Sequence, residues 1–336
     1  MNTRTLVAAL AGLSLIAAAC GSDSDSDEST STDPPSTESV SSEPAVTEPA
    51  TTEATATESA DTEPATTDGV PATPERVVSL SPTHTEVMFA IGAGDMLVAV
   101  DDFSNYPAEA LELPNELSGF EPNVEAIASY EPDLVLIGGD FTGLGDQLAE
   151  LDIESWDGPA ASTISDTYTQ IEQLGAATGN VAEAAELVAS MQTRIDEIVA
   201  TSGDSGAGLS FYHELDPTYF SADSSTFIGE VYGALGLQNI ADGDDTESFG
   251  FPQLNAEFIV AANPDLIFLA DTKCCGETAD TVAVRPGWDA IVAVQNGNVI
   301  EMDDDIASRW GPRIVDYLDE VADAVANVNA GVVAES

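Results

Sequence analysis

One short pattern occurs twice in this chain, and no other feature limits the possible folds as strongly. The segment 123–127 (NVEAI) leads after four residues to 132–134 (PDL), and 255–259 (NAEFI) leads after four residues to 264–266 (PDL). Every matched position in the second copy lies 132 residues after its counterpart. Each copy predicts a helix N-cap, a short helix, a Pro-Asp turn and a buried strand, so we expect two lobes of similar topology.

The rest of the folded part alternates strands with helices. Apolar runs bounded by turn residues predict strands at Val77–Leu80, Met96–Val100, Leu134–Ile137, Ile153–Trp156, Gly208–Tyr212, Leu266–Ala270 and Asn298–Met302. Helices are expected at Thr83–Ile91, Thr226–Leu235 and Arg309–Val328. This alternation predicts an α/β fold of two Rossmann-like lobes with mainly parallel sheets.

The stretch 181–202 connects the two lobes, with residues 76–180 expected in the first and 203–330 in the second. Its apolar residues recur at helical spacing over about 20 residues, which corresponds to a helix of roughly 30 Å. A single helix of this length is a stiff bridge that would hold the lobes at a fixed angle with a cleft on one side. An ordinary surface helix of one domain is the alternative.

The first 19 residues have the features of a secretory signal. Arg4 supplies a positive charge, the apolar run Leu6–Ala18 is short for a membrane span, and small residues precede Cys20. This arrangement predicts cleavage before Cys20 and a diacylglycerol on its thiol, although Ala17 stands where leucine is usual. Two or more acyl chains make a stable anchor. The alternative is an ordinary cleaved signal that leaves Cys20 as a free thiol.

Residues 20–75 are expected to form a disordered, acidic tether behind that anchor. Ser, Thr, Asp, Glu, Pro and Ala dominate this segment, and it has no aromatic residue. It cannot bury enough apolar surface to offset the entropy of ordering it. A module on a long tether suits a binding protein, and it suits an anchored enzyme equally well.

The charge balance excludes one class of partner. The chain carries 7 basic and 61 acidic residues, for a formal net charge of -54. Such a surface repels a phosphate backbone, so we expect no nucleic-acid partner. It also disfavours adsorption to anionic lipid without an anchor.

Several segments of the fold stand in a distinctive order. They are Arg76–Glu86 followed by Gly92–Gly94, then Asp101–Pro107, Asn123–Leu134, and Arg309–Arg313 before a last helix. Each motif is loose, but their order and spacing from Arg76 to about Asn327 resemble the iron-siderophore and vitamin B12 family of solute-binding proteins. The resemblance implies the class III architecture, in which one long helix bridges two α/β lobes.

The resemblance also implies a function. Members of this family capture a small-molecule metal chelate outside the cell and deliver it to the permease dimer of an ABC importer, which an ATPase drives. We therefore expect a lipid-anchored extracytoplasmic monomer that is not an enzyme and holds no cofactor. The family also gives the repeated pattern a meaning, since Glu125 and Glu257 occupy the positions of the two carboxylates that dock on the permease. Carboxylate–guanidinium pairing suits such docking, although a Glu in the first turn of a helix is favoured by the helix dipole in any case.

Ligand contacts are expected from segments that follow the strands and face the gap between the lobes. Aromatic side chains there suit the flat or apolar faces of a corrin, a haem or a siderophore, although an aromatic residue after a strand is often only packing. The candidate ligand-binding residues are Pro82, Thr83, His84, Phe103, Tyr106, Phe120, Tyr212, His213, Tyr219, Phe220, Phe251, Arg309 and Trp310. His84 and His213 each follow the first strand of a lobe, so they could meet across a metal centre or could simply be hydrogen-bonded loop residues.

The scarcity of basic residues favours certain ligands. Beyond the signal the chain has six Arg and Lys residues and no cluster of them, whereas an anionic tricatecholate complex would require one. We therefore expect cobalamin or another corrinoid, or a ferric hydroxamate-type siderophore. A haem receptor and a receptor for free Zn or Mn ions are alternatives, and two histidines make the metal-ion reading weak. A membrane-anchored hydrolase is the alternative of another class, but no catalytic motif supports it.

Cys274 and Cys275 are adjacent and are the only thiols left once Cys20 is lipidated. An oxidising compartment favours a disulfide between them. Two free thiols or a soft-metal site are the alternatives. A redox catalyst is not expected, because its usual motif places two residues between the cysteines.

Overall fold

The computed structural model describes residues 73–243 and 249–335. The predicted signal peptide at 1–19, the lipidated Cys20 and nearly all of the tether at 20–75 lie outside the described residues. None of the described helices is both long enough and apolar enough to cross a bilayer.

The first lobe is built on a four-stranded parallel sheet of β1 (Val77–Leu80), β2 (Leu97–Val100), β3 (Leu134–Ile137) and β4 (Glu154–Asp157), in the order β2-β1-β3-β4. The helices α1 (Pro82–Ala90) and α4 (Ile164–Thr178) pack on one face of this sheet, and α2 (Val124–Ala128) and α3 (Leu144–Ala149) pack on the other. Two short 3₁₀ helices, η1 (Gly94–Met96) and η2 (Ala108–Glu112), flank β2. The central strands β1 and β3 are buried on both faces, which explains their largely apolar sequence, whereas the edge strand β4 is mostly exposed.

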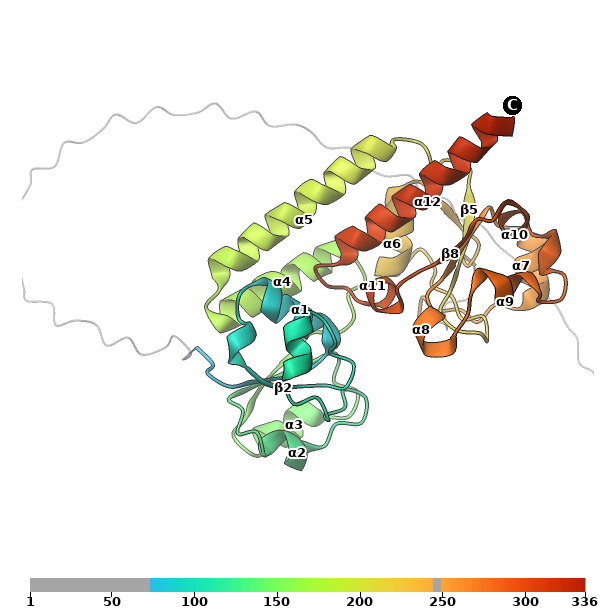
Figure 1. Ribbon diagram of the computed structural model, residues 1–336. Coiled ribbons are helices and arrows are strands. Elements are labelled where there is room, and N and C mark those ends of the chain that lie inside the picture. The colour runs from blue at the N-terminus through green and yellow to red at the C-terminus, as the bar shows by residue number, and fades with distance from the viewer. Residues whose placement is uncertain (1–72, 244–248, 336) are drawn as a thin grey trace, which may run out of the picture. The chain divides into compact units, whose positions relative to one another are not determined.

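The second lobe repeats this plan with β5 (Ser210–Glu214), β6 (Gln238–Asn239), β7 (Leu266–Leu269) and β8 (Val299–Glu301), in the order β6-β5-β7-β8. Helix α6 (Phe227–Ala234) lies on one face, as Figure 1 shows. The other face carries α7 (Ala256–Ala262), α9 (Ala279–Ala283), η3 (Trp288–Ala290) and α10 (Val292–Asn296). The remaining helices are α8 (Thr272–Cys275), α11 (Asp304–Ser308) and α12 (Ile314–Glu335).

The repeated sequence pattern has the same structural role in both lobes. Asn123 and Asn255 cap α2 and α7, each accepting a hydrogen bond from the backbone N–H three residues later, at 3.1 and 2.9 Å. The Asp of each Pro-Asp pair binds the start of the neighbouring strand: Asp133 accepts from Arg76 N (3.0 Å), and Asp265 accepts from Ser210 N (2.8 Å). The pattern therefore satisfies backbone donors at a helix start and at a strand start, which is why both copies retain it.

Helix α5 (Val181–Ser202) follows the first lobe and leads into the second. Its buried stripe contains Ala184, Val188, Met191 and Ile198, and α12 lies alongside it (Figure 1). These residues belong to one apolar core that continues into both sheets. The predicted fold class, two lobes with parallel sheets joined by one long helix, is confirmed.

One strand differs from the expectation in a way that affects the site. The predicted strand Gly208–Tyr212 lies two residues later, at Ser210–Glu214, where His213 pairs with Phe268 and Glu214 with Leu269. His213 is therefore a strand residue and does not follow the strand. His84 likewise lies in the first turn of α1, not in a loop.

Candidate functional site

A cavity of about 650 Å³ opens at the carboxyl end of the first sheet. Leu80 at the end of β1 and Ile137 at the end of β3 form part of its wall. Ser81 caps α1 through its side chain and Pro82 occupies the first helical turn, so the chain turns sharply away from β1. The cavity lies at the carboxyl ends of parallel strands, where α/β proteins usually bind ligands.

Gly119 forms a tight part of this cavity. A Cβ atom placed on Gly119 would lie 2.4 Å from the backbone oxygen of Leu80. Backbone on both sides of the contact leaves no flexible group to move, so only glycine fits without a shift of the chain.

Replacing Gly119 by Ala is therefore expected to destabilise the protein by about 1–3 kcal/mol, the cost typical of overpacking, and to narrow the cavity. Urea unfolding and ligand titration measure the two effects. The control is Gly233→Ala, because a Cβ on Gly233 would meet open space. Gly143 also has open space, but its φ of +70° would strain an alanine. If Gly119→Ala and Gly233→Ala cost the same, the predicted clash is absent.

Three phenylalanines line the cavity with unusually exposed side chains. Phe103, Phe120 and Phe141 are 51%, 79% and 92% exposed, and Phe103 meets Phe120 edge to face with ring centroids 5.7 Å apart. An exposed apolar cluster around a cavity indicates a binding surface. Covering each ring with an apolar ligand face would contribute about 2 kcal/mol.

Trp310 reaches the cavity from the segment before α12, and it is held by residues behind it. Its Nε1–H donates to Gln170 Oε1 (2.9 Å), which also lies 3.1 Å from His84 Nε2. The Gln170 amide nitrogen donates to the Pro159 carbonyl (2.7 Å), so Oε1 is the atom that faces both rings. His84 therefore supports the cavity wall from behind, and burial lowers its pKa to about 4 while the Gln170 hydrogen bond partly opposes that shift.

Arg309 lines the same wall, but its donors are already used. Its Nη1 donates to Glu86 Oε1 (2.8 Å) and Asn105 Oδ1 (3.0 Å), and its Nη2 donates to the Phe103 carbonyl (3.0 Å) and Asp305 Oδ1 (2.6 Å). All four terminal N–H groups of the guanidinium thus have partners within the protein. Arg309 serves the shape of the wall and has only its Nε–H left to offer a ligand.

Glu86 lies at the centre of this ion network. It is 3% exposed, and besides Arg309 it accepts hydrogen bonds from Arg313 Nε (2.8 Å) and Nη2 (2.6 Å). Arg313 in turn lies over the Tyr106 ring at 4.3 Å from its centroid.

Burial alone would raise the pKa of Asp305, but a hydrogen bond from Lys273 and the charge of Arg309 hold that pKa below its ordinary value.

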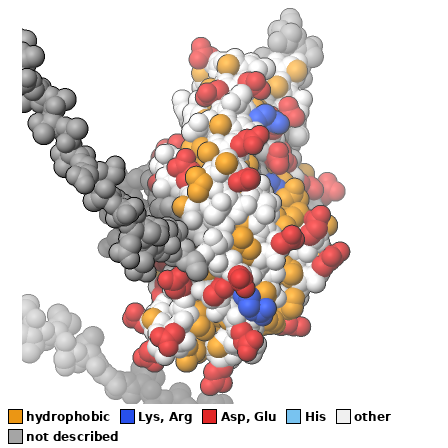
Figure 2. Space-filling view, turned by 90° about the vertical axis from the view of Figure 1, so that its left-hand side faces the viewer, with side chains coloured by type: hydrophobic (Ala, Val, Ile, Leu, Met, Phe, Trp, Pro, Cys, Tyr) orange, Lys and Arg blue, Asp and Glu red, His pale blue; other side chains and the backbone are white. Residues whose placement is uncertain are grey.

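Every basic side chain that the structure describes is likewise bound to acceptors within the protein. Each one contacts protein acceptors: Arg76 the Tyr130 and Glu131 carbonyls, Arg194 Asp319, Lys273 Asp303 and Asp305, Arg285 Glu214 and Glu277, and Arg309 and Arg313 Glu86. The cavity itself is lined by three carboxylates, Asp101, Asp140 and Asp305, and one guanidinium. Figure 2 shows a face of the molecule on which acidic side chains far outnumber basic ones.

The structure brings together six of the thirteen predicted ligand-binding residues. Pro82, Thr83, Phe103, Phe120, Arg309 and Trp310 line the cavity. Sequence reasoning omitted Phe141, although Phe141 follows β3 closely and meets the rule applied to the other aromatics. It also omitted Asp101, Gly119 and Asp305, whose placement depends on contacts between distant segments.

The other seven predicted residues lie elsewhere. His84 is behind Trp310, and Tyr106 stacks on Arg313. Tyr219 stacks on Trp288 with ring centroids 6.0 Å apart, and Phe220 and Phe251 are 37% and 40% exposed without lining the cavity. Tyr212 and His213 are fully buried.

Tyr212 and His213 are core residues because the strand that contains them has two buried faces. Tyr212 packs edge to face on Trp288, and His213 Nδ1 lies 2.8 Å from the Tyr232 hydroxyl on α6. Burial lowers the pKa of His213 to about 3, so the imidazole is neutral. The expected meeting of His84 and His213 across a metal centre is not what the structure shows. His84 packs against Trp156 and Trp310, whereas His213 packs against Tyr232 in the core of the second lobe.

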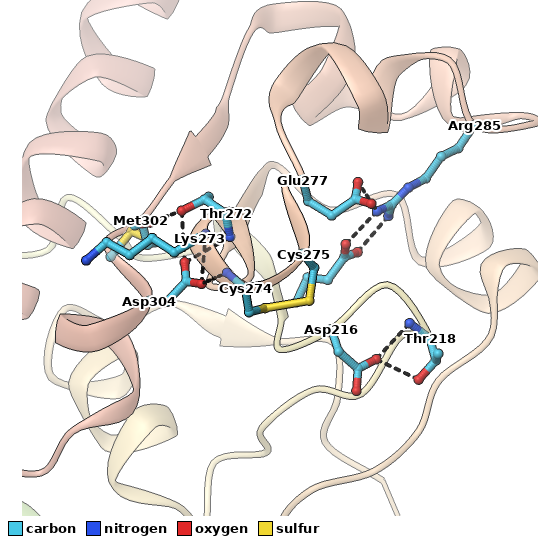
Figure 3. Close-up of a disulfide and its surroundings, with 11 residues drawn as sticks. Asp216, Thr218, Thr272, Lys273, Cys274, Cys275, Glu277, Arg285, Met302 and Asp304 are labelled. Atoms are coloured by element: carbon cyan, nitrogen blue, oxygen red, sulfur yellow. Dashed lines mark hydrogen bonds and ion pairs between the residues drawn. A yellow bond between two sulfur atoms is a disulfide. The ribbon is translucent and has the colours of Figure 1, made fainter. Parts of the chain in front are cut away.

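Cys274 and Cys275 form a disulfide in α8, and both residues are exposed. Figure 3 shows the helix beside Asp304, whose carboxylate accepts hydrogen bonds from the backbone N–H groups of Thr272, Lys273 and Cys274 at 2.8–2.9 Å. Asp304 therefore fixes the start of α8 next to Asp305, which lines the cavity.

Asp271 lies directly before α8 and is fully buried, with no hydrogen-bond partner for either carboxylate oxygen among the described residues. Burial, with repulsion from Glu214 and Glu277, raises its pKa to about 7, against the opposing charge of Arg285. The folded protein therefore holds a proton that the unfolded chain loses near pH 4, and stability falls as pH rises from about 4 to about 7.

Replacing Asp271 by Asn is expected to remove that loss. Relative to the wild type, D271N should gain roughly 2 kcal/mol of unfolding free energy between pH 4 and pH 8, because one pKa unit corresponds to about 1.4 kcal/mol and repacking reduces the effect. Urea unfolding of both proteins at pH 4.5, 6 and 8 measures this change. A difference between the two proteins that does not vary with pH would contradict it.

The candidate docking residues stand at matching positions. Glu125 and Glu257 occupy the first turns of α2 and α7, each two residues after the capping asparagine, and both are exposed. Neither has a salt-bridge partner among the residues that the structure describes. Their carboxylates are therefore available to a partner.

Comparison with known proteins agrees with this architecture. A family model described as periplasmic binding protein matches residues 77–306. The ABC transporter substrate-binding lipoprotein YvrC of Bacillus subtilis, named as uncharacterized, is 31% identical over 260 residues, covering 75% of this chain and 80% of that protein. The cobalamin-binding protein of Halobacterium salinarum is 31% identical over 264 residues, covering 76% of this chain and 70% of that protein.

A solved structure shows the same fold. The crystal structure of the periplasmic vitamin B12-binding protein BtuF of Vibrio cholerae superposes with a TM-score of 0.65 at 25% sequence identity, covering 76% of this chain and 98% of that chain. The family match extends over most of both lobes and the helix between them. This protein therefore belongs to the periplasmic binding protein family.

Proposed function

We propose that this protein captures a low-charge metal chelate, a corrinoid in the first place and a ferric hydroxamate in the second, and delivers it to the permease of an ABC importer. Periplasmic binding proteins are non-enzymatic, extracytoplasmic components of such importers and work with a permease and an ATPase. The observation that carries the choice of ligand is the combination of exposed phenylalanines with a wall whose only cation is already bound.

The charge of the cavity argues against an anionic ligand. A tricatecholate complex would bring several negative charges beside Asp101, Asp140 and Asp305. The terminal N–H groups of Arg309 could bind this complex only by breaking their hydrogen bonds to protein acceptors such as Glu86 and Asn105. A buried polar group that loses its partner costs about 1–3 kcal/mol, and more when the group is charged. The names of two similar proteins, which refer to cobalamin and vitamin B12, support the corrinoid as the first choice.

A thermal-shift screen of the purified protein tests the proposal. The probes are cyanocobalamin, dicyanocobinamide, haem, a ferric trihydroxamate, a ferric tricatecholate, and zinc and manganese ions. We expect a rise of several degrees with a corrinoid or the hydroxamate complex, since a ligand that binds only the folded state stabilises it by mass action. The choice of ligand would be refuted if the tricatecholate, haem or a bare ion stabilised the protein while the corrinoids and the hydroxamate complex did not.

The proposal extends to the anchor and to docking. We propose that Cys20 carries the lipid that holds the protein at the outer side of the membrane, that the protein acts as a monomer, and that Glu125 and Glu257 dock on the permease. Cys20→Ser is expected to release the protein from the membrane fraction into the soluble extracytoplasmic fraction, which fractionation followed by immunoblotting measures. Retention of the variant in the membrane fraction would refute the lipid anchor.

A further inference from the structure

Four oxygen–oxygen contacts link Asp101 to the end of β1 through a buried chain of hydroxyls. Ser79 Oγ donates to the Ser81 carbonyl (3.1 Å), and Thr85 Oγ1 lies 2.9 Å from Ser79 Oγ. Thr85 Oγ1 also lies 2.8 Å from Ser104 Oγ, and Ser104 Oγ lies 2.5 Å from Asp101 Oδ1. All these residues are buried, so no solvent enters the chain.

One carboxylate oxygen of Asp101 belongs to this chain. Thr85 Oγ1 donates to Ser79 Oγ, and Ser104 Oγ donates to Asp101 Oδ1. Burial raises the pKa of Asp101 to about 6, against the hydrogen bonds that its carboxylate accepts from Ser104 and from the Phe103 backbone. Oδ1 is therefore already used within the protein.

Because Oδ1 accepts from Ser104, Oδ2 is the oxygen of Asp101 that remains for the cavity. Asp101 is 1% exposed, yet it lines the cavity, and its Oδ2 lies close to Gly119, another lining residue. An ionised carboxylate has lone pairs and no hydrogen, so Oδ2 can accept a hydrogen bond but cannot donate one. Asp101 therefore offers an acceptor on the cavity side.

We propose that Asp101 is a specificity-determining residue, whose Oδ2 accepts a hydrogen bond from an N–H group of the ligand. The inference rests on the proposed function and refines it: among chelates of low charge, the cavity selects those with amide N–H donors at their edge over those that carry only acceptors there. A corrinoid with free carboxamides meets this requirement next to the apolar ring face that the phenylalanines would cover.

Two corrins that differ in their side chains test the proposal on the full protein. Dicyanocobinamide carries peripheral carboxamides, and dicyano heptamethyl cobyrinate has methyl esters in their place, which accept hydrogen bonds but donate none. We expect the wild type to bind the amide at least tenfold more tightly, measured by tryptophan quenching and checked by calorimetry. The ratio of the two affinities is the readout, because a merely structural role of Asp101 would change both affinities alike.

Substitutions at Asp101 separate recognition from structure. Asp101→Asn can donate to Ser104 and still present an oxygen to the cavity, so it should keep the ratio within threefold of the wild type. Asp101→Leu has a similar size and no acceptor, so its ratio should fall about tenfold; Asp101→Ser replaces it if the leucine variant does not fold. Asp102→Asn removes a charge from the exposed neighbouring residue, which does not line the cavity, and should leave the ratio unchanged.

The outcomes distinguish this inference from the function on which it rests. An unchanged ratio in Asp101→Leu or Asp101→Ser, or a ratio near one in the wild type, overturns the role of Asp101 and leaves the proposed function intact. Binding of the ferric hydroxamate without either corrin overturns the inference as stated for corrinoids. Failure of every chelate in the thermal-shift screen overturns the proposed function, and this inference with it.

Discussion

Glu86→Ala is expected to lower the free energy of unfolding by about 3–5 kcal/mol, which is the range found when one partner of a buried ion pair is removed. The substitution would leave the guanidiniums of Arg309 and Arg313, which are 6% and 13% exposed, side by side without the carboxylate between them. Urea unfolding followed by tryptophan fluorescence measures the loss. Ligand affinity should fall too, because Arg309 holds the Phe103 loop and Asp305 at the cavity.

The matched control is Glu172→Ala, which removes an exposed carboxylate from α4 of the same lobe. It should change stability by less than about 0.5 kcal/mol, as is usual for surface positions. A loss in Glu86→Ala no larger than in this control would show that the ion network adds little to the fold.

Reversing the charge of both docking candidates is expected to reduce uptake at least about 100-fold while leaving chelate affinity within twofold. Breaking one close charge pair at an interface costs roughly 2–5 kcal/mol, and the variant Glu125→Arg/Glu257→Arg would break two and introduce repulsion. Each single variant should reduce uptake about tenfold or more. The measurement is uptake of the labelled chelate by proteoliposomes that contain the permease and its ATPase, with the affinity of the same preparations determined separately.

Glu150→Arg/Asp280→Arg is the control for net charge. These exposed acids change the total charge by the same amount, one in each lobe, but lie outside the repeated pattern. Their uptake should stay within about threefold of the wild type. An equal reduction in the control pair would point to a general electrostatic effect and against specific docking at Glu125 and Glu257.

The parts of the fold predicted well are those specified locally. The pattern of Asn, Glu and Pro-Asp determines a helix cap, a short helix and a strand start within a dozen or so residues, so α2, α7, β3 and β7 follow from sequence. The position of β5 was predicted two residues too early, because His213 and Glu214 are polar residues in a fully buried part of the strand. Their burial is possible because each has a hydrogen-bond partner far away in the sequence. The His213 imidazole contacts Tyr232, and the Glu214 carboxylate accepts from Arg285, 71 residues away.

The candidate site shows the same limit. Aromatic residues that follow strands can be found from sequence, and Phe103, Phe120 and Phe141 all line the cavity, although only the first two were predicted. The contacts that decide the charge of the cavity cannot be found in this way. Arg309 and Glu86 are 223 residues apart, so the sequence shows a scarce cation but not that its donors are already used. Asp101 likewise is held by a chain of hydroxyls contributed by β1, α1 and the loop after β2.

The core that continues from one sheet through α5 and α12 to the other has a consequence for the kinetics of import. Lobes packed on a shared pair of helices should close only slightly on loading, so Glu125 and Glu257 keep nearly the same separation in the empty and the loaded protein. Empty protein should then compete with loaded protein for the permease. We expect the rate of uptake to follow the loaded fraction of the pool, and an excess of protein over chelate to act as an inhibitor of its own importer.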